Sequence, residues 1–341
     1  MKSGKIRVLV VDDSAFFREV LVRGISADKS ILVVDTARDP YDARDKILKH
    51  RPDVMTCDIQ MPKMDGIEFI RQLIPQYPIP VIVISTVSGA VFDAISAGAV
   101  DFIAKPVYNS PESFRNFINE LIYKIKAAST ARVAWNRAAV PVEKSGGTLS
   151  ASNADRIIAI GASTGGTEAI ARIISALSAN MPGIVIVQHI PPVFSGMFAK
   201  RLDAISSLEV REARNGDYVE QGKVLVAPGD RHMRVKKAGG RYRVECFEGE
   251  RVNGHCPSVD VLFESVATAA GSSAIGVILT GMGYDGAKGL LAMRKKGAIT
   301  IGQDEASSVV YGMPKVACNI GAVEKQVPLD SIAKTIVSLL S

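Results

Sequence analysis

Residues 6–14, IRVLVVDDS, decide the fold of the first part of the chain. A short, mostly apolar run (Ile6–Val11) leads directly into Asp12 and Asp13, and a helical pattern begins at Ala15. An apolar run without polar alternation is typical of a strand that is buried on both faces of a parallel sheet. The two carboxylates then lie at the carboxyl end of that strand, where open α/β sheets bind ligands.

The same alternation of strand and helix continues through the first 126 residues. Five strands are expected, at Ile6–Val11, Ile31–Val34, Val54–Cys57, Pro80–Ile84 and Phe102–Ala104. Amphipathic stretches between and after them predict five helices, so the N-terminal part is expected to be a parallel sheet covered by helices on both faces. Residues 127–154 are small and polar and are interpreted as a linker.

The alternation resumes in residues 155–341. The expected strands are Ile157–Ile160, Ile184–Gln188, Ala274–Thr280 and Ala298–Ile301, each followed by a helical pattern. Residues 210–250 differ, because glycines interrupt short β runs in the manner of hairpins. The sequence therefore predicts a second, doubly wound α/β domain with a β-hairpin insertion.

Composition narrows the possible functions. The length of 341 residues predicts two domains, and 47% hydrophobic with 22% charged residues is ordinary globular usage. Forty-one Lys and Arg against 35 Asp and Glu leave a charge of +6 that is thinly spread, so nucleic acid is not indicated as a partner. The four cysteines form no C-x-x-C pair, and no signal peptide or membrane span is expected. A cytoplasmic protein is predicted.

Five polar side chains fall at the expected strand ends of the N-terminal sheet: Asp12, Asp13, Asp58, Ser85 and Lys105. Carboxylates gathered at one edge repel one another unless a cation lies among them, and oxygen ligands favour Mg²⁺. A carboxylate such as Asp58 can act as a nucleophile towards phosphorus, with the lysine and the serine hydroxyl contacting the phosphoryl oxygens. Taken singly, each aspartate could instead end a strand or cap a helix.

Serine, histidine and aspartate follow three expected strands of the C-terminal part. Ser163 lies in a G-x-S-x-G pattern between a strand and a helix, His189 ends the next strand, and Asp285 lies in the loop after the strand 274–280. This set suits a serine nucleophile with an imidazole base oriented by a carboxylate. Main-chain N–H groups of 281–283, or of Thr164, are candidates for an oxyanion hole. The open alternatives are a phosphate-binding glycine turn and a structural role for His189.

The N-terminal motifs resemble the receiver domain of two-component response regulators. The resemblance rests on VLVVDDS, PDVMTCDIQMPKMDG and DFIAKP, and it implies a flavodoxin-like fold. It implies Asp58 as the phosphorylation site, Asp12, Asp13 and Asp58 as Mg²⁺ ligands, and Ser85 and Lys105 as phosphoryl contacts. The segment from Thr86 to Val100 is shorter than is usual, which predicts a short fourth helix.

The whole chain outside the linker resembles the CheB family of chemotaxis response regulators, the protein-glutamate methylesterases. The matching stretches include IAIGASTGG, VIVQHIPPVFSGMFAKRL, NGHCPSVDVLFESVA and ILTGMGYDGAKGL. The resemblance implies Ser163 as nucleophile, His189 as base, Asp285 as the third member, and Thr164 and the Met282 main chain near the oxyanion. Cys256 stands where relatives often have arginine.

The family likeness implies an activity and partners. The expected reaction is hydrolysis of glutamyl methyl esters on methyl-accepting chemotaxis receptors with release of methanol, together with deamidation of receptor glutamines. A chemotaxis histidine kinase would be the phosphodonor, and Mg²⁺ would serve receiver phosphorylation, with no cofactor for the esterase reaction. We also expect an intramolecular contact between receiver and catalytic domain that phosphorylation releases. Nucleic acid binding and membrane insertion are not expected.

Two further hypotheses remain open from the sequence. The first is a receiver joined to a nucleotide-binding output module without hydrolase activity, and the second is a DNA-binding regulator, for which no recognition helix is evident. Six basic residues lie between Arg231 and Arg243. They could attract acidic receptor helices over a long range, or they could simply form the solvated face of a hairpin.

Overall fold

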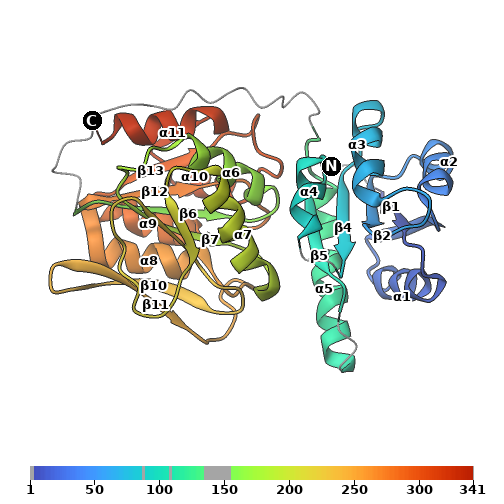
Figure 1. Ribbon diagram of the computed structural model, residues 1–341, viewed down its shortest axis with the longest axis horizontal. Coiled ribbons are helices and arrows are strands. Elements are labelled where there is room, and N and C mark those ends of the chain that lie inside the picture. The colour runs from blue at the N-terminus through green and yellow to red at the C-terminus, as the bar shows by residue number, and fades with distance from the viewer. Residues whose placement is uncertain (1–3, 87–88, 107–109, 134–154, 341) are drawn as a thin grey trace. The chain divides into compact units, whose positions relative to one another are not determined.

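The computed structural model describes residues 4–86, 89–106, 110–133 and 155–340. The chain divides into two compact units, Met1–Ala138 and Ala139–Ser341 (Figure 1). Most of the predicted linker, residues 134–154, lies outside the described residues. Its first two residues are helical, because helix α5 runs through Pro111–Ala128 and ends beyond the expected boundary at 126.

The N-terminal unit is a five-stranded, wholly parallel sheet with the order β2-β1-β3-β4-β5. Its strands are β1 (Ile6–Val11), β2 (Ile31–Ala37), β3 (Val54–Asp58), β4 (Val81–Ser85) and β5 (Asp101–Ala104). Its helices are α1 (Ala15–Ser26), α2 (Pro40–His50), α3 (Gly66–Gln76), α4 (Ala90–Ser96) and α5. This confirms the expected flavodoxin-like sheet.

The order of the strands reverses between β1 and β3, which are neighbours although β2 separates them in sequence. Such a switch point opens a crevice at the carboxyl ends of the two strands. Asp12 directly follows β1, and Asp58 is the last residue of β3. Helix α4 has only seven residues and is the shortest of the helices described in this unit, in agreement with the short segment in the sequence.

The C-terminal unit is built on a seven-stranded parallel sheet with the order β14-β13-β12-β6-β7-β9-β8. Its strands are β6 (Ile157–Ala162), β7 (Gly183–Gln188), β8 (Glu209–Glu212), β9 (Lys223–Val226), β12 (Ala274–Ile278), β13 (Ile299–Gln303) and β14 (Lys325–Val327). Its helices are α6 (Gly166–Ala176), α7 (Pro192–Ile205), α8 (Val259–Ala270), α9 (Ala287–Lys295), α10 (Met313–Asn319) and α11 (Leu329–Ser338), with a 3₁₀ turn at Gly271–Ser273. The doubly wound prediction is confirmed.

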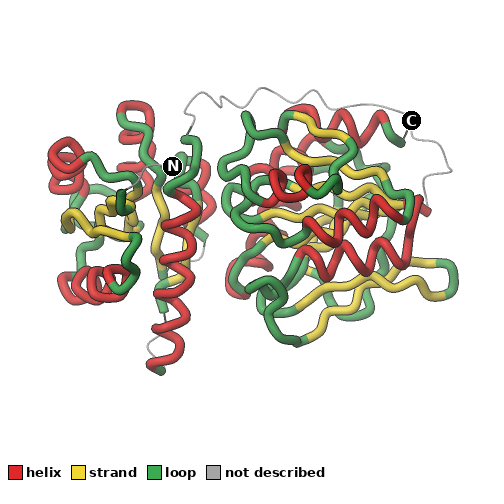
Figure 2. The backbone as a smooth tube through the Cα atoms, turned by 180° about the vertical axis from the view of Figure 1, so that it is seen from behind, coloured by secondary structure: helices red, strands yellow, loops and turns green. Residues whose placement is uncertain are grey.

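Helices form two packed groups in this unit. Helix α6 packs against α7 and α11, and α9 packs against α8 and α10. The antiparallel hairpin of β10 (His232–Ala238) and β11 (Arg241–Phe247) lies against α8 at the side of the unit (Figures 1 and 2). Met233, Val235 and Val244 of the hairpin join the buried cluster of α8, which explains why the insertion is held in place.

One sequence interpretation of this unit needs correction, and two short elements were missed. The short β runs at β8 and β9 are not hairpin strands, because they pair in parallel and extend the main sheet beyond β7. Only β10 and β11 form a hairpin among the described residues. Strand β14 and helix α10 were not predicted, since three and seven residues are too few to show a clear period.

Candidate functional site

Three reactive side chains follow three neighbouring strands of the C-terminal sheet. Ser163 directly follows β6, His189 directly follows β7, and Asp285 lies in the loop after β12. The switch point of this sheet lies between β6 and β12, so the three residues follow strands that flank the crevice that the topology opens. Main-chain hydrogen bonds join the strand ends: Ser163 N donates to Thr280 O at 3.0 Å, and His189 N to Ala162 O at 3.1 Å.

The turn after β6 depends on Gly165. This residue has a φ of +77°, and a Cβ here would lie 2.6 Å from Val309 Cβ. Ser163 is not among the described residues with positive φ, so the strain of a nucleophile elbow does not fall on the serine. Gly281 passes so near that a Cβ on it would lie 2.7 Å from Ser163 Cβ. The glycines therefore bring the loop that carries Asp285 against the serine.

His189 and Asp285 form a hydrogen-bonded pair. The distance from His189 Nε2 to Asp285 Oδ2 is 2.8 Å, and both side chains are buried. An ionised carboxylate can only accept, so this bond assigns the ring proton to Nε2 and leaves the lone pair on Nδ1. Nδ1 is buried and has no hydrogen-bond partner among the described residues. It is the ring atom that remains available to take a proton.

Asp285 is surrounded by donors. Oδ1 accepts from Asn253 Nδ2 at 2.8 Å and from Ser258 Oγ at 2.7 Å, and Oδ2 also accepts from the main-chain N–H of Val259 at 2.7 Å. Burial alone would raise the pKa of Asp285, but the hydrogen bonds from His189, Asn253 and Ser258 hold this pKa well below its ordinary value. The carboxylate is therefore ionised at neutral pH and fixes the tautomer of His189.

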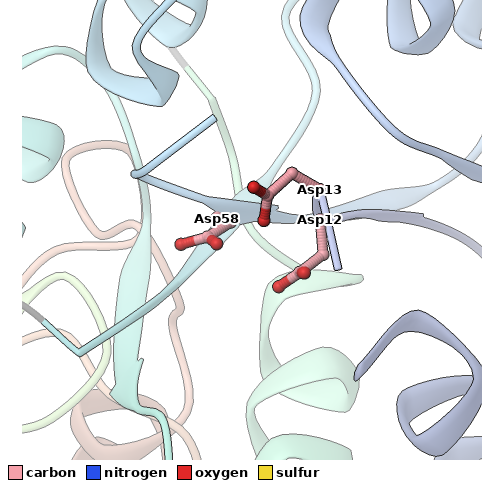
Figure 3. Close-up of side chains that lie close together, drawn as sticks. All are labelled: Asp12, Asp13 and Asp58. Atoms are coloured by element: carbon pink, nitrogen blue, oxygen red, sulfur yellow. The ribbon is translucent and has the colours of Figure 1, made fainter. Parts of the chain in front are cut away.

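The N-terminal unit gathers three carboxylates at its own switch point. One oxygen from each of Asp12, Asp13 and Asp58 lies within 4.8 Å of the others (Figure 3). Asp12 and Asp58 are buried, whereas Asp13 is exposed. Lys105 Nζ lies 2.9 Å from Asp12 Oδ2 and 2.5 Å from Asp58 Oδ2. Hard oxygen donors of this kind fit Mg²⁺ better than softer metals.

The charges in this cluster influence one another. Burial raises the pKa of Asp58, as does the nearby charge of Asp12, and the hydrogen bond from Lys105 opposes but does not cancel this rise. Burial tends to lower the pKa of Lys105, but the two aspartates outweigh it and raise this pKa. Ser85 is buried and is the last residue of β4. The residue before it, Ile84, pairs with Asp58 of the neighbouring strand β3. All five residues predicted from the sequence thus lie at one edge of the sheet.

Comparisons with known proteins identify the families of both units. A family model described as CheB methylesterase matches residues 158–336, and one described as response regulator receiver domain matches residues 8–119. The chain is 57% identical over 343 residues to a protein of Syntrophomonas wolfei named protein-glutamate methylesterase/protein-glutamine glutaminase 2, and the match covers 100% of this chain and 99% of the relative. The chain belongs to the CheB methylesterase family.

Other members of the family are similarly close. A protein of Pseudomonas aeruginosa with the same printed name is 46% identical over 332 residues, covering 96% of this chain and 95% of its own length. The crystal structure of the Thermotoga maritima CheB methylesterase catalytic domain is 38% identical, has a TM-score of 0.53, and covers 54% of this chain and 98% of that one. The nucleotide-binding alternative finds no support among these relatives, which are named as hydrolases.

The main-chain donors predicted for an oxyanion hole are not all available. The N–H of Gly281 donates to Val310 O at 3.0 Å, so this group is already used in the fold. The correction has a physical reason: Gly281 forms a bridge with Tyr311, and the loop is tied to that segment. The other positions predicted for the oxyanion hole are Thr164, which is buried, and Met282, which is half-buried.

Sequence reasoning missed the residues that support the pair. Asn253, Ser258 and His255 lie in the loop between β11 and α8, and His255 stacks on His189 with ring centroids 3.6 Å apart. Gln188 donates from Nε2 to Ser163 O at 3.0 Å and to His189 O at 3.1 Å. The segment Asn253–Ser258 comes just before a helix, so its polar residues could be interpreted from the sequence as a helix cap and did not point to a site.

Several of the basic residues of the hairpin form ion pairs. Arg234 and Lys236 both pair with Glu245, at 2.7 and 2.5 Å, and Arg241 pairs with Glu220 at 2.5 Å. Hydrogen bonds from Arg234 and Lys236 lower the pKa of Glu245 to about 2. These local pairs favour the interpretation of a solvated hairpin over a concentrated positive surface.

Proposed function

We propose that this chain hydrolyses the methyl esters of glutamyl side chains on chemotaxis receptors, under the control of phosphorylation at Asp58. The observation that carries the proposal is the 2.8 Å bond between His189 and Asp285 beside the strand end that bears Ser163. Relatives across the whole chain that carry the printed name protein-glutamate methylesterase/protein-glutamine glutaminase support the substrate class.

The first half of the reaction forms an acyl-enzyme. Ser163 Oγ attacks the carbonyl carbon of the ester while its proton passes to His189 Nδ1, and the carbonyl oxygen becomes an oxyanion near Thr164 and Met282. The tetrahedral intermediate then breaks its bond to the methoxy oxygen, which takes the proton from His189 and leaves as methanol. Asp285 stays ionised and stabilises the imidazolium between these two steps.

The second half returns the serine. Water attacks the acyl carbon, gives a proton to His189 Nδ1, and the bond from carbon to Ser163 Oγ breaks as the oxygen takes that proton back. One water is consumed for each methanol released, and the product is a glutamyl carboxylic acid, which ionises. With a receptor glutamine as substrate the leaving group is ammonia instead, which is the proposed glutaminase activity. Neither half requires a metal or organic cofactor.

The receiver unit supplies the control. Asp58 would accept a phosphoryl group from a chemotaxis histidine kinase, and Ser85 and Lys105 would contact the phosphoryl oxygens. Asp12, Asp13 and Asp58 would hold Mg²⁺, which supplies charge neutralisation for the incoming phosphoryl group. We propose that the unphosphorylated receiver restricts access of the substrate to Ser163 and that phosphorylation relieves this restriction.

The proposed site of action is the cytoplasm. The four cysteines are all free thiols, as is usual in a reducing compartment. Among the residues that the structure describes, no helix is both long enough and apolar enough to cross a membrane. The proposed macromolecular partners are the receptor substrate and the kinase, with no role for nucleic acid.

Replacement of the nucleophile tests the activity. The Ser163→Ala variant should release no methanol from methylated receptor above background, while Asp58 is still labelled by a small-molecule phosphodonor. Ser195→Ala is not a suitable control because Ser195 is buried and bonded to Glu212. Thr268→Ala, which shortens an exposed side chain on α8, is the matched control and should retain the rate. Retained turnover in Ser163→Ala would refute the assignment.

Replacement of the phosphoacceptor tests the control. Asp58→Ala should keep basal release of methanol but should not respond to phosphodonor, whereas the unmodified chain should be stimulated. Equal stimulation of the two would show that the control does not pass through Asp58.

A further inference from the structure

The ring of a second histidine, His255, lies flat against the ring of His189. The rings of His189 and His255 have centroids 3.6 Å apart and planes only 10° from parallel. His255 is half-buried and comes from the loop between β11 and α8, far in sequence from His189. Neither the proposed proton transfers nor the bond to Asp285 uses this ring, so its place in the site needs its own explanation.

The loop that carries His255 is fixed at both ends by one buried imidazole. His232 Nε2 lies 2.8 Å from Glu250 O, and His232 Nδ1 accepts from Ser258 N at 3.2 Å. Between these anchors, Val252 and His255 exchange two main-chain hydrogen bonds of 3.0 Å. The loop is therefore anchored at both ends and bridged between them.

The same loop also holds the carboxylate. Asn253 and Ser258 both donate to Asp285 Oδ1. The same loop thus contacts Asp285 through hydrogen bonds and His189 through the face of the His255 ring. A single hydrogen bond to Asp285 fixes one point of the His189 ring but leaves rotation about that bond open. A flat ring contact restricts this rotation, because turning the imidazole would break the stack.

We propose that His255 is a positioning residue for the reaction, which keeps the His189 ring in the plane where Nε2 meets Asp285 and leaves Nδ1 to take the proton. This inference rests on the proposed function and adds a residue to it. It requires a flat ring at position 255, not an acid, a base or a metal ligand. The lone pair of an imidazole nitrogen lies in the plane of its ring. Because the rings of His189 and His255 lie in parallel planes, their lone pairs do not point at a common ion.

Three variants of the full-length chain test the ring requirement. His255→Phe keeps a flat ring, His255→Leu keeps bulk without flatness, and His255→Ala removes both. We expect kcat for methanol release to fall about 10- to 100-fold in the Leu and Ala variants, with KM within about 2-fold, because a base displaced by about 1 Å loses rate of this order. His255→Phe should recover most of that loss.

A serine-directed fluorophosphonate gives a second readout that does not depend on receptor binding. Its rate of reaction with Ser163 should fall in His255→Leu and His255→Ala and stay near the original value in His255→Phe. Val252→Ala is the matched control, because it shortens an exposed side chain of the same loop and leaves the main-chain bridge to His255 in place. Thermal unfolding midpoints identify any variant that is misfolded.

The outcomes separate this inference from the proposed function. Original rates in all three variants, equal losses in all three, or a change in KM alone would overturn the positioning role. Absence of methanol release from the unmodified chain would instead refute the esterase proposal, and the fluorophosphonate rates would still decide whether His255 positions His189.

Discussion

Asp285 Oδ2 lies 2.8 Å from His189 Nε2, and this bond joins the loop after β12 to the end of β7 across the intervening strand β6. It uses the ring nitrogen farther from the His189 main chain, so the proposed reaction has Nδ1 as its base. In the serine proteases of the chymotrypsin type the roles of the two nitrogens are reversed. The same chemistry is possible with either arrangement, because one ring nitrogen bonds the carboxylate and the other is left to take the proton of the serine.

Replacing the carboxylate by its neutral amide should remove most of the activity. Asp285→Asn keeps the shape of the side chain but permits the wrong tautomer, with the proton on Nδ1, and we expect kcat to fall about 10³- to 10⁴-fold, as in the corresponding protease variant. Methanol release under saturating receptor measures this. Asp330→Asn, at an exposed position on α11, is the control. A loss of less than 10-fold would show that Asp285 does not set the tautomer.

The same carboxylate should make the stability of the catalytic unit depend on pH. The pKa of Asp285 in the folded state lies below its ordinary value of 3.8. A lowered carboxyl pKa contributes stability that is fully present above the unfolded value and is lost as the pH falls towards the folded value. The difference in unfolding midpoint between the unmodified chain and Asp285→Asn should therefore be constant above about pH 5 and shrink in stronger acid. A difference that grows on acidification would contradict the direction of this shift.

The positions of Ser163, His189 and Asp285 could be predicted because each follows a strand with a clear apolar pattern. Parallel strands bring their carboxyl ends to one edge, so strand ends predict a site even when no contact is known. Asn253, Ser258 and His255 could not be predicted in this way, since they lie in a loop without periodicity. Their contacts with Asp285 and His189 depend on how the loop between the hairpin and α8 is anchored, for example by His232, and this is a tertiary property. For the same reason, β8 and β9 appeared to be hairpin strands.

Removal of Mg²⁺ should affect the regulation by the receiver unit but not the basal activity of the catalytic unit. Chelation with EDTA is expected to abolish stimulation by a small-molecule phosphodonor, because Asp12, Asp13 and Asp58 would then repel the phosphoryl group. Basal methanol release should be unchanged, since the proposed reaction at Ser163 uses only side chains and water. Restoring Mg²⁺ in excess should restore stimulation, while Asp13→Asn should require more Mg²⁺ for the same effect. A loss of basal turnover on chelation would show that the esterase reaction itself needs a metal.

A buried ion pair in the receiver unit gives a prediction about stability. Lys124 Nζ of α5 lies 2.8 Å from Asp101 Oδ1 at the start of β5, and both side chains are about 10% exposed. Burial tends to lower the pKa of Lys124, but Asp101 and Glu120 outweigh it and raise this pKa, so the lysine stays charged. Lys124→Met leaves Asp101 buried without this cation and should lower the free energy of unfolding by about 3–5 kcal/mol.

The double variant Lys124→Met/Asp101→Leu should recover much of that loss, because it removes both buried charges together. Hydrogen exchange of the α5 and β5 segments in the full-length chain measures the effect within the receiver unit. Glu19→Gln provides the control: it breaks the exposed pair with Arg23 and should change stability by no more than about 0.5 kcal/mol. A double variant that exchanges as fast as Lys124→Met would show that the pair itself, and not relief of a lone buried charge, stabilises the junction between α5 and β5.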